Sequence, residues 1–346
     1  MQIMMKAMVL EKISMIADNP IPLKMAYLPV PILQENEVLL KISACGVCHT
    51  ELDEIEGRTP PSYLPVVPGH QIVGRVEQKG KAVSKFRLGD RVGVGWINSS
   101  CGKCDFCRRG DENLCDDFKA TGRDVNGGYA EYTVVSEDFA FSIPDLYEDI
   151  QAAPLLCAGS IGYRSIRLCE IKNGLNIGFV GFGASAHIAI QIARHLYPES
   201  KLFVFARSLE ERNFAKELGA YWAGDISEKP PQNVYAMIDT TPVWKPILYA
   251  LKNLEKGGRL VINAIRKEET DKNVLLGLDY PSHLWLEKEI KTVANVTRKD
   301  IAGFLELAGK INLKIETQRY KLEEANQALW ELKNRKIRGA KVLIID

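Results

Sequence analysis

The sequence lacks an excess of charge of either sign. Its 346 residues include 45 Lys and Arg against 44 Asp and Glu, which gives a formal net charge of +1. A nucleic-acid-binding surface needs a dense basic patch, and an acidic or basic tail needs a block of like charges; the sequence shows neither. It therefore predicts no nucleic-acid partner.

Long apolar runs are also missing. The longest, from Ile177 to Ile190, is interrupted by three glycines and by His187, so it does not fit a membrane-spanning helix. The N-terminal residues include Lys6 and Glu11 and contain no apolar stretch of signal-peptide length. These absences predict a soluble cytoplasmic protein with no membrane partner. In that compartment, clustered cysteines bind metal more often than they form disulfides.

Four of the eight cysteines lie in one short polar stretch. Cys101, Cys104 and Cys107 are spaced by two residues each, and Cys115 follows after seven more. Four thiolates at this spacing match a closed tetrahedral zinc site. The residues around them are too charged to form a hydrophobic core, so the metal would organise the loop. Because all four positions are occupied, we expect a structural zinc; a cluster of free or oxidised cysteines is the alternative.

The apolar segments predict two domains, as the length of the chain also does. Between Lys6 and about Ile143, short apolar runs alternate with Gly, Pro and Asp, which is typical of an irregular β-rich domain. From Pro154 to about Asn295, strands alternate with helices, which indicates a doubly wound parallel sheet. After Thr297 we expect two helices and a final strand that return to the first domain.

A glycine-rich turn in the second domain predicts a dinucleotide site. Gly181 and Gly183 follow a buried strand predicted at 175–180, and Ala186 takes the place of the third glycine of the fingerprint. The turn opens a helix, whose N-terminal N–H groups would face a pyrophosphate. An ordinary turn between a strand and a helix is the alternative.

The end of the next predicted strand, 201–206, indicates which cofactor binds. An NAD site has an acidic residue there, about 20 residues beyond the glycine turn, to hold the ribose 2′-hydroxyl. This chain has Arg207 and Ser208, which suit a 2′-phosphate. The sequence therefore favours NADP(H) over NAD(H); a solvated arginine beside a site that accepts both cofactors is the alternative.

A second group of candidate metal ligands lies in the first domain. Cys48 offers a thiolate and His70 an imidazole, and the segment between them is long enough to fold back on itself. Thr50 and Glu51 add a hydroxyl and a carboxylate beside the thiol. We therefore expect a metal site here with polar groups around it.

Together these features resemble the zinc-dependent alcohol dehydrogenases of the medium-chain dehydrogenase/reductase superfamily, over nearly the whole chain. The resemblance is carried by the segments 46–51, 69–70, 295–298 and 336–342, the four-cysteine motif, Cys157 and the glycine turn. It implies a GroES-like β-rich catalytic domain at 1–157, a Rossmann dinucleotide-binding domain at 158–296 and a return to the catalytic domain at 297–346. It also implies a homo-oligomer, either a dimer or a tetramer.

The resemblance implies two zinc ions per chain. The structural ion would occupy the four-cysteine motif, and the catalytic ion would be held by Cys48, His70 and Cys157 with an open position for the substrate. Thr50 would hydrogen-bond the alcohol and start the proton relay; a threonine that only ends a strand is the alternative. Glu51 would orient the histidine ligand.

Other positions allow more than one interpretation. His49 and a tail residue would contact the pyrophosphate, but Arg338 and Lys341 both lie near the family's tail position. Trp96 would narrow the substrate pocket and favour small primary alcohols; core packing is its alternative. Gln71 stands where many relatives carry a glutamate, so a role for this residue as a transient zinc ligand is weakened.

We therefore predict a zinc-dependent, NADP(H)-preferring alcohol dehydrogenase that acts reversibly on small alcohols and aldehydes. Polyols, aryl alcohols or secondary alcohols with NAD(H) are alternative substrates. A non-catalytic redox sensor is the second alternative, but it would lack a catalytic ligand and none is missing. Asp53 replaces the histidine that passes the proton to solvent in several relatives, so the relay would end on Asp53, water or the ribose. Cys45 and Cys169 match no ligand position and are expected to be buried.

Overall fold

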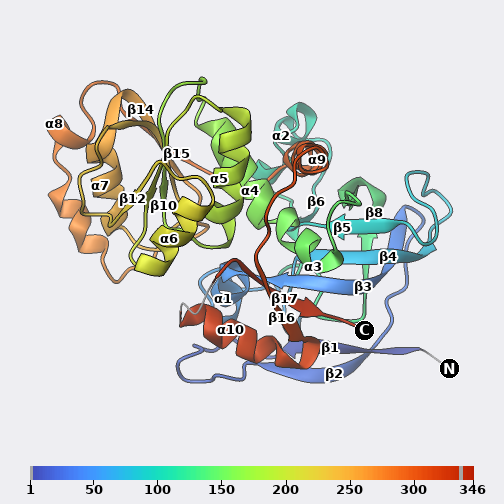
Figure 1. The fold of residues 1–346 in the computed structure, drawn as a ribbon. Coiled ribbons are helices and arrows are strands. Elements are labelled where there is room, and N and C mark those ends of the chain that lie inside the picture. The colour runs from blue at the N-terminus through green and yellow to red at the C-terminus, as the bar shows by residue number, and fades with distance from the viewer. Residues whose placement is uncertain (1–2, 335–337) are drawn as a thin grey trace. The chain divides into compact units, whose positions relative to one another are not determined.

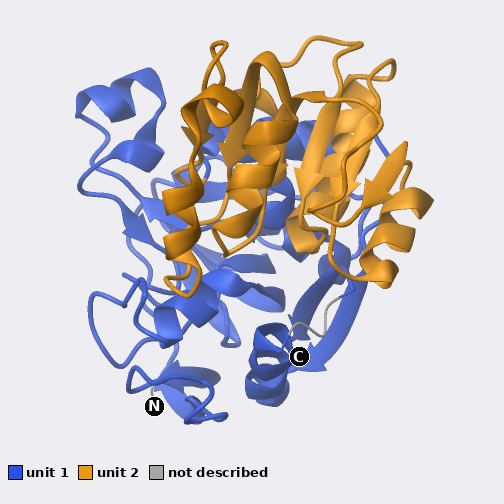
Figure 2. Cartoon of the chain, turned by 90° about the vertical axis from the view of Figure 1, so that its left-hand side faces the viewer, with its two compact units in different colours: residues 1–160, 296–346 blue, residues 161–295 orange. Residues whose placement is uncertain are grey.

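The computed structural model describes residues 3–334 and 338–346, and the chain divides into two compact units. Unit 1 contains residues 1–160 and 296–346, and unit 2 contains residues 161–295 (Figure 2). Unit 2 is continuous in sequence, whereas unit 1 is built from both ends of the chain. Lys336 and Ile337, which belong to the tail segment quoted above, lie outside the described residues.

Unit 1 is built around one long strand, β3 (Glu37–Val47). It pairs antiparallel with β4 (Gln71–Lys79), with β8 (Tyr132–Ser136) and with the C-terminal strand β17 (Ala340–Ile344). The sheet has the order β16-β17-β3-β4-β5-β9, with β8 also beside β3. Its other strands are β5 (Arg91–Val94), β9 (Ala140–Ser142) and β16 (Thr317–Lys321). Two small sheets complete the unit: β1 (Met4–Leu10) with β2 (Leu23–Pro29), and β6 (Ile97–Ser99) with β7 (Lys119–Ala120).

Short helices connect these strands. They are α1 (His49–Ile55), α2 (Asp105–Arg109), α3 (Asp149–Ala152), α9 (Arg298–Ala308) and α10 (Ala325–Lys333), with 3₁₀ helices at Glu112–Leu114, Glu137–Phe139, Ala153–Leu156 and Leu322–Glu324. Helix α4 (Ala158–Leu168) spans the boundary between the units. Helices α1 and α10 contact each other (Figure 1), and α10 contributes Ala328 and Leu329 to the hydrophobic core that fills the β-rich unit.

Unit 2 is a six-stranded sheet in the order β12-β11-β10-β13-β14-β15, and all of its pairs are parallel. The strands are β10 (Ile177–Val180), β11 (Leu202–Phe205), β12 (Trp222–Gly224), β13 (Val234–Asp239), β14 (Leu254–Ile262) and β15 (Glu289–Thr292). The helices are α5 (Ala184–Leu196), α6 (Leu209–Glu217), α7 (Lys245–Asn253) and α8 (Tyr280–His283), with a 3₁₀ helix at Lys272–Gly277. Helices α5 and α7 lie on opposite sides of the sheet (Figure 1), so the predicted doubly wound parallel sheet is confirmed.

Two further observations concern the cysteines outside the candidate metal sites and the apolar character of the helices. Cys45 and Cys169 are 0% and 1% exposed, so both are buried as predicted. Over the described ranges, none of the helices has the length and apolar character needed to cross a bilayer.

Candidate metal centres and nucleotide-binding edge

The pairing of β3 with β4 brings two candidate metal ligands to one edge of the sheet. In this antiparallel pair Gly46 lies opposite Gln71, and Cys48 follows the end of β3 while His70 precedes the start of β4. Gly69 precedes His70 with φ +97°, and a Cβ there would lie 2.4 Å from the Tyr129 ring. Only glycine fits this backbone conformation and this contact, so the turn that presents His70 depends on it.

Cys157 completes the group from another part of unit 1. It follows the 3₁₀ helix Ala153–Leu156, which packs against β3 and β4. The Cys48 Sγ and His70 Nε2 atoms are 3.7 Å apart, and the ligand atoms of Cys48, His70 and Cys157 all lie within 4.8 Å of one another. The structure thus brings together three side chains that are far apart in the sequence.

Glu51 fixes the orientation of the imidazole. Its Oε1 lies 2.6 Å from His70 Nδ1, and both side chains are fully buried. Its Oε2 accepts a hydrogen bond of 2.8 Å from the Cys48 backbone N–H, because Cys48 is the N-cap of α1 and Glu51 occupies the third position of the helix. One carboxylate therefore turns His70 Nε2 toward the Cys48 sulfur and also holds the cysteine backbone.

The charges at this site fit a divalent cation. The adjacent Cys157 thiol and burial raise the pKa of Cys48 well above its ordinary value. Burial opposes protonation of His70, but the Glu51 carboxylate and Cys48 raise its pKa overall. Two thiolates cannot converge at low dielectric without a compensating positive charge. The donor set of two sulfurs and one imidazole nitrogen suits zinc and leaves a fourth tetrahedral position.

The other candidate site residues in this part of unit 1 are Thr50, His49 and Trp96, and they differ in exposure. Thr50 is 7% exposed in the first turn of α1, so it does not end a strand; its backbone N–H donates to Cys48 Sγ at 3.4 Å. His49 is exposed at the start of the same helix. Trp96 is 6% exposed between β5 and β6 and packs against Phe118, with ring centroids 5.2 Å apart.

The two departures from the family pattern are both buried. Gln71 is 2% exposed, and its side chain covers the backbone of Gly46. Asp53 lies near the end of α1 and pairs with the Arg58 guanidinium. Burial raises the pKa of Asp53, although Arg58 opposes this shift. Asp53 can therefore be protonated more readily than an exposed aspartate.

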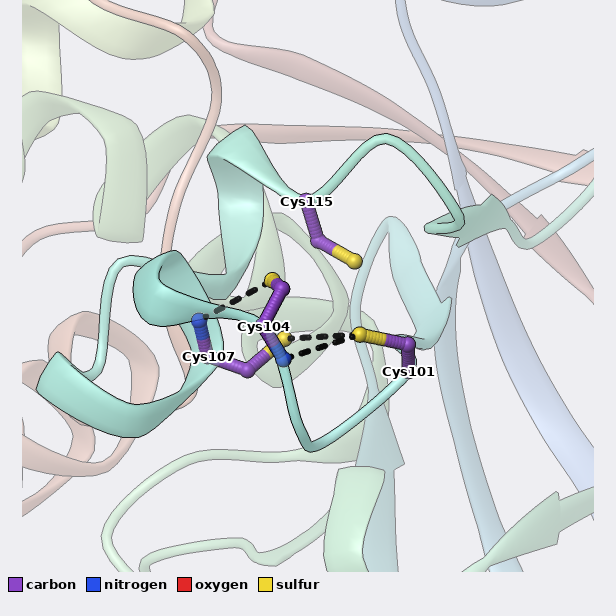
Figure 3. Close-up of side chains that lie close together, drawn as sticks. All are labelled: Cys101, Cys104, Cys107 and Cys115. Atoms are coloured by element: carbon purple, nitrogen blue, oxygen red, sulfur yellow. Dashed lines mark hydrogen bonds between the residues drawn. The ribbon is translucent and has the colours of Figure 1, made fainter.

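The four cysteines of the polar stretch form a separate cluster (Figure 3). Their sulfur atoms all lie within 4.8 Å of one another, and the sulfurs of Cys101 and Cys107 are 3.8 Å apart. The backbone N–H of Cys104 donates to the Cys101 sulfur at 3.3 Å, and that of Cys107 donates to the Cys104 sulfur at 3.5 Å. Backbone N–H groups of Lys103 and Cys104 lower the pKa of the Cys101 thiol to about 6. The backbone of the loop thus stabilises negative charge on the sulfur of Cys101, whereas, against backbone hydrogen bonds, desolvation and the neighbouring thiols raise the pKa values of Cys104 and Cys115.

In unit 2, the predicted glycine turn follows β10. Gly181 has φ +82°, and a Cβ there would meet the Thr240 hydroxyl at 2.8 Å. Gly183 is the N-cap of α5, no side chain caps this helix in the described structure, and a Cβ at Gly183 would meet no described atom within 4 Å. Ala186 is fully buried where the helix packs on the sheet. An uncapped 13-residue helix behind an open glycine turn fits a bound pyrophosphate.

The residues after β11 carry two guanidinium groups, of which the sequence analysis identified one. Arg207 is exposed, and Ser208 caps α6 by accepting from the Glu211 N–H at 3.0 Å. Arg212, one turn into the helix, donates to the carbonyls of Ser208 and Arg207, both at 3.3 Å. The spacing of an N-cap and a basic residue four positions later could have revealed Arg212 in advance.

Two further lysines have defined partners. Lys267 donates to the carbonyl oxygens of Thr241 and Val243 at 2.7 and 3.0 Å and pairs with Asp239, which ends β13 beside the glycine turn. Lys341 is fully buried, and its Nζ lies 2.8 Å from a Glu331 carboxylate oxygen. Lys341 is therefore engaged within the protein, whereas Arg338 is half-buried.

Comparisons with known proteins agree with this architecture. A model of the alcohol dehydrogenase GroES-like domain matches residues 34–145, which confirms the predicted fold of the catalytic domain. "Probable alcohol dehydrogenase AdhA" of Mycobacterium tuberculosis is 40% identical over 329 residues, which cover 94% of this chain and 93% of that protein. An alcohol dehydrogenase of Geobacillus stearothermophilus is 34% identical over 328 residues, covering 90% and 93%. A solved cinnamyl alcohol dehydrogenase from Sorghum bicolor has a TM-score of 0.86 at 26% identity and covers 99% of this chain and 98% of its own.

Proposed function

Since this chain belongs to the zinc-dependent alcohol dehydrogenases of the medium-chain dehydrogenase/reductase superfamily, we propose that it interconverts small primary alcohols and aldehydes with NADP(H) as the preferred hydride carrier. The observation that carries the proposal is the convergence of Cys48, His70 and Cys157 within 4.8 Å at the ends of paired strands. A redox sensor without turnover would not need this incomplete donor set, because a structural site is closed by a fourth protein ligand.

Cys48, His70 and Cys157 would hold the catalytic zinc. When bound, zinc supplies Lewis acidity that polarises the substrate oxygen and eases the loss of its proton. Glu51 keeps His70 Nε2 directed at the metal position through its 2.6 Å contact with Nδ1. The four-cysteine cluster, with no position left for a substrate, would hold a second, structural zinc.

The chain also supplies groups that would move the proton. Thr50 lies in the first turn of α1, two residues after Cys48, and would accept the hydrogen bond of the substrate hydroxyl. Asp53 follows on the same helix and is 7% exposed, and burial raises its pKa so that it would hold a proton at its carboxylate before release. Arg58, which pairs with Asp53, would keep the deprotonated form available.

The positive groups after β11 support the choice of NADP(H). Arg207 is exposed, so its guanidinium group is available to a 2′-phosphate. Arg212 folds back over the same turn, but its guanidinium group pairs with the Glu228 carboxylate at 3.1 Å and donates to two backbone carbonyls. Glu211 adds a carboxylate beside Ser208, but it is occupied in the cap of α6. We assign the phosphate contact to Arg207 and Ser208. The pyrophosphate would lie at Gly181, Gly183 and Ala186.

Cofactor preference tests this assignment directly. We expect a higher kcat/KM with NADPH than with NADH, and Arg207→Ala should lower the NADPH value about tenfold while leaving the NADH value within about twofold. A matched control is Arg194→Ala, since Arg194 lies on α5 and donates to the Leu218 carbonyl at 3.2 Å. A clear preference of the wild-type protein for NADH would reject the assignment.

The similarity to the sorghum cinnamyl alcohol dehydrogenase supports a second substrate class, aryl alcohols. Trp96 separates the two classes if it lines the pocket, because a large ring in the pocket would exclude an aryl group. A panel of ethanol, butanol, benzyl alcohol and cinnamyl alcohol, each as kcat/KM, decides between them.

We also propose a homo-oligomer, which light scattering coupled to size-exclusion chromatography would test.

A further inference from the structure

Glu54, in the last turn of α1, is a buried acid that the proposed chemistry does not use. It is 1% exposed, and neither of its carboxyl oxygens has a hydrogen-bond partner of standard geometry among the residues that the structure describes. It lies three positions after Glu51 on the same buried helix. A second carboxyl group is thus packed beside the one that holds His70.

Folding alone does not explain this residue. A buried carboxyl without hydrogen bonds destabilises the folded state, and an apolar side chain of the same length would avoid that cost. A residue that breaks a local rule of packing in a well-ordered core is a candidate for a functional role. The question is then which neighbouring group needs an acceptor at this position.

The Trp96 indole is such a group. Its Nε1–H is buried and, in the described part of the chain, has no hydrogen-bond partner of standard geometry. The two groups lie in the same buried region, since Trp96 packs in one hydrophobic core with Leu52 and Ile55 of α1. Hydrogen bonding from Trp96 also acts to lower the pKa of Glu54. Their alignment falls short of a standard hydrogen bond, and a small adjustment or one buried water would complete it.

The rest of the indole contacts an aromatic ring and a guanidinium group. The Phe118 ring packs against it at 5.2 Å and an interplanar angle of 45°. The Arg123 guanidinium lies over it at 5.2 Å, and Arg123 is itself fixed by Asp124. These contacts restrain the plane of the ring, but they do not decide which edge of the ring points toward α1. The Nε1–H end needs an acceptor, and Glu54 is the acceptor beside it.

We propose that Glu54 is a positioning residue for Trp96: it holds the indole Nε1–H and thereby sets the width of the substrate pocket. The proposal rests on the proposed function, since it needs Trp96 to line that pocket. It makes Glu54 a specificity-determining residue that acts through another side chain and does not touch the substrate. The substrate class that it selects is the small primary alcohols.

The protonation of Glu54 is compatible with this role. Burial, with a further contribution from the negative charge of Glu51, raises the pKa of Glu54 to about 8, against opposing contributions from His70, Trp96 and Arg123. The side chain is therefore largely a neutral acid at pH 7. Its carbonyl oxygen still accepts from the indole, so an amide at this position should serve as well.

Two variants of similar length separate positioning from packing. Glu54→Gln keeps an acceptor, and Glu54→Met removes it. We expect Glu54→Met to raise the ratio of kcat/KM for benzyl alcohol to that for ethanol by about tenfold, mainly through KM for the larger substrate. Glu54→Gln should keep the wild-type ratio within about twofold. In a Trp96→Phe background, which removes the donor, Glu54→Met should have no further effect on the ratio.

The indole resonance gives a readout that does not depend on catalysis. Each of the five tryptophans gives one indole ¹H–¹⁵N signal, and Trp96→Phe identifies the signal of Trp96. We expect this signal to shift in Glu54→Met and to stay near its wild-type position in Glu54→Gln. If it is unchanged in Glu54→Met, the proposal is wrong, whatever the activity. If it shifts but the ratio is unchanged in folded, active protein, Trp96 does not set the pocket width. A wild-type protein with no dehydrogenase activity would reject the proposed function and leave the indole result intact.

Discussion

The two clusters of candidate metal ligands in unit 1 differ in how the chain builds them. Cys101, Cys104, Cys107 and Cys115 come from one local stretch, with backbone N–H groups donating to the sulfurs of Cys101 and Cys104. The other cluster gathers Cys48, His70 and Cys157 from three distant segments, and the β3–β4 pair sets two of these positions. The first cluster is held by its own loop, and the second is held by the core of the unit.

This difference predicts different consequences of losing a ligand. The local cluster has little apolar packing of its own, so its zinc would supply the folding free energy of the loop. The dispersed cluster lies on a framework that is stable through its hydrophobic core, so its metal would contribute mainly to chemistry. Removing a ligand from the dispersed cluster should therefore reduce the activity of the protein, and removing one from the local cluster should reduce its stability.

The largest expected effect is the loss of activity in Cys48→Ala. Zinc lowers the activation barrier of this chemistry by several kcal/mol, so without it kcat should fall about a thousandfold or more. The thermal midpoint should stay close to the wild-type value, since the β3–β4 framework is unchanged. Steady-state kinetics and calorimetry on the same preparation measure both. Cys45→Ala is the matched control, because Cys45 is fully buried nearby and should retain activity.

Cys104→Ser should show the opposite pattern. We expect one zinc per chain to be lost and the thermal midpoint to fall by about 10 °C, which corresponds to roughly 3–4 kcal/mol. Activity per folded molecule, assayed well below the midpoint, should remain within about threefold of wild type. Metal analysis, calorimetry and kinetics test this. A variant as stable as wild type but inactive would reverse the roles of the clusters.

The framework of the dispersed cluster can be weakened without touching a ligand. In Glu331→Gln, the fully buried Lys341 loses its carboxylate partner, and Lys341 lies opposite Val47, one residue before Cys48. We expect the free energy of unfolding to fall by about 3 kcal/mol. The control is Glu306→Gln, which breaks an exposed pair with Lys310 and should cost no more than about 0.5 kcal/mol. Urea denaturation measures the free energy of unfolding of both variants. Equal losses in Glu331→Gln and Glu306→Gln would contradict this prediction.

The same ion pair predicts a pH dependence. Hydrogen bonds from Lys341, Tyr320 and Gln327 lower the pKa of Glu331 from 4.5 to about 2. A group with a lowered pKa stabilises the folded state above its unfolded pKa, so this contribution is present above pH 4.5 and is lost as the pH falls toward 2. Urea midpoints of metal-free wild-type protein should decline over that window, and Glu331→Gln should decline less. Parallel declines would show that the pair does not contribute.

The smallest of these effects is expected for Glu51→Gln. The amide keeps the shape of the side chain but removes the charge that faces His70 Nδ1 at 2.6 Å. Metal affinity and kcat should fall about 10–100-fold, as is usual for partners of metal-binding histidines. Chelator competition should detect weaker retention of one zinc and unchanged retention of the other. Equal weakening of both zincs would mean that Glu51 acts through the stability of the fold.

Local patterns made much of this structure predictable from the sequence. The strand predicted at 175–180 and the glycine turn after it are found at β10 and Gly181, because both depend on residues close in the chain. The four-cysteine cluster was predicted for the same reason, since its spacing already limits how far apart the sulfurs can lie. Resemblance to a family was needed to connect Cys157 to Cys48 and His70, because their convergence is set by strand pairing.

Features that depend on tertiary packing were not predictable. Nothing in the pattern around Lys341 distinguishes a buried lysine from an exposed one; only the pairing of β17 with β3 and β16 encloses it. The alternative considered for Thr50, the end of a strand, was wrong because Cys48 caps a helix. Glu54 reads as one of several acids in a polar stretch, and its burial appears only once α1 packs into the core.

The central claim is that Cys48, His70 and Cys157 hold one metal ion with an open coordination position. Zinc-edge X-ray absorption on Cys104→Ser, in which only this site should remain filled, tests it most directly. We predict two sulfur scatterers per zinc at about 2.3 Å, with the remaining ligands being nitrogen or oxygen at about 2.0–2.1 Å. A shell of four sulfurs, or a two-sulfur spectrum that persists unchanged after the further substitution Cys48→Ala, would contradict the account.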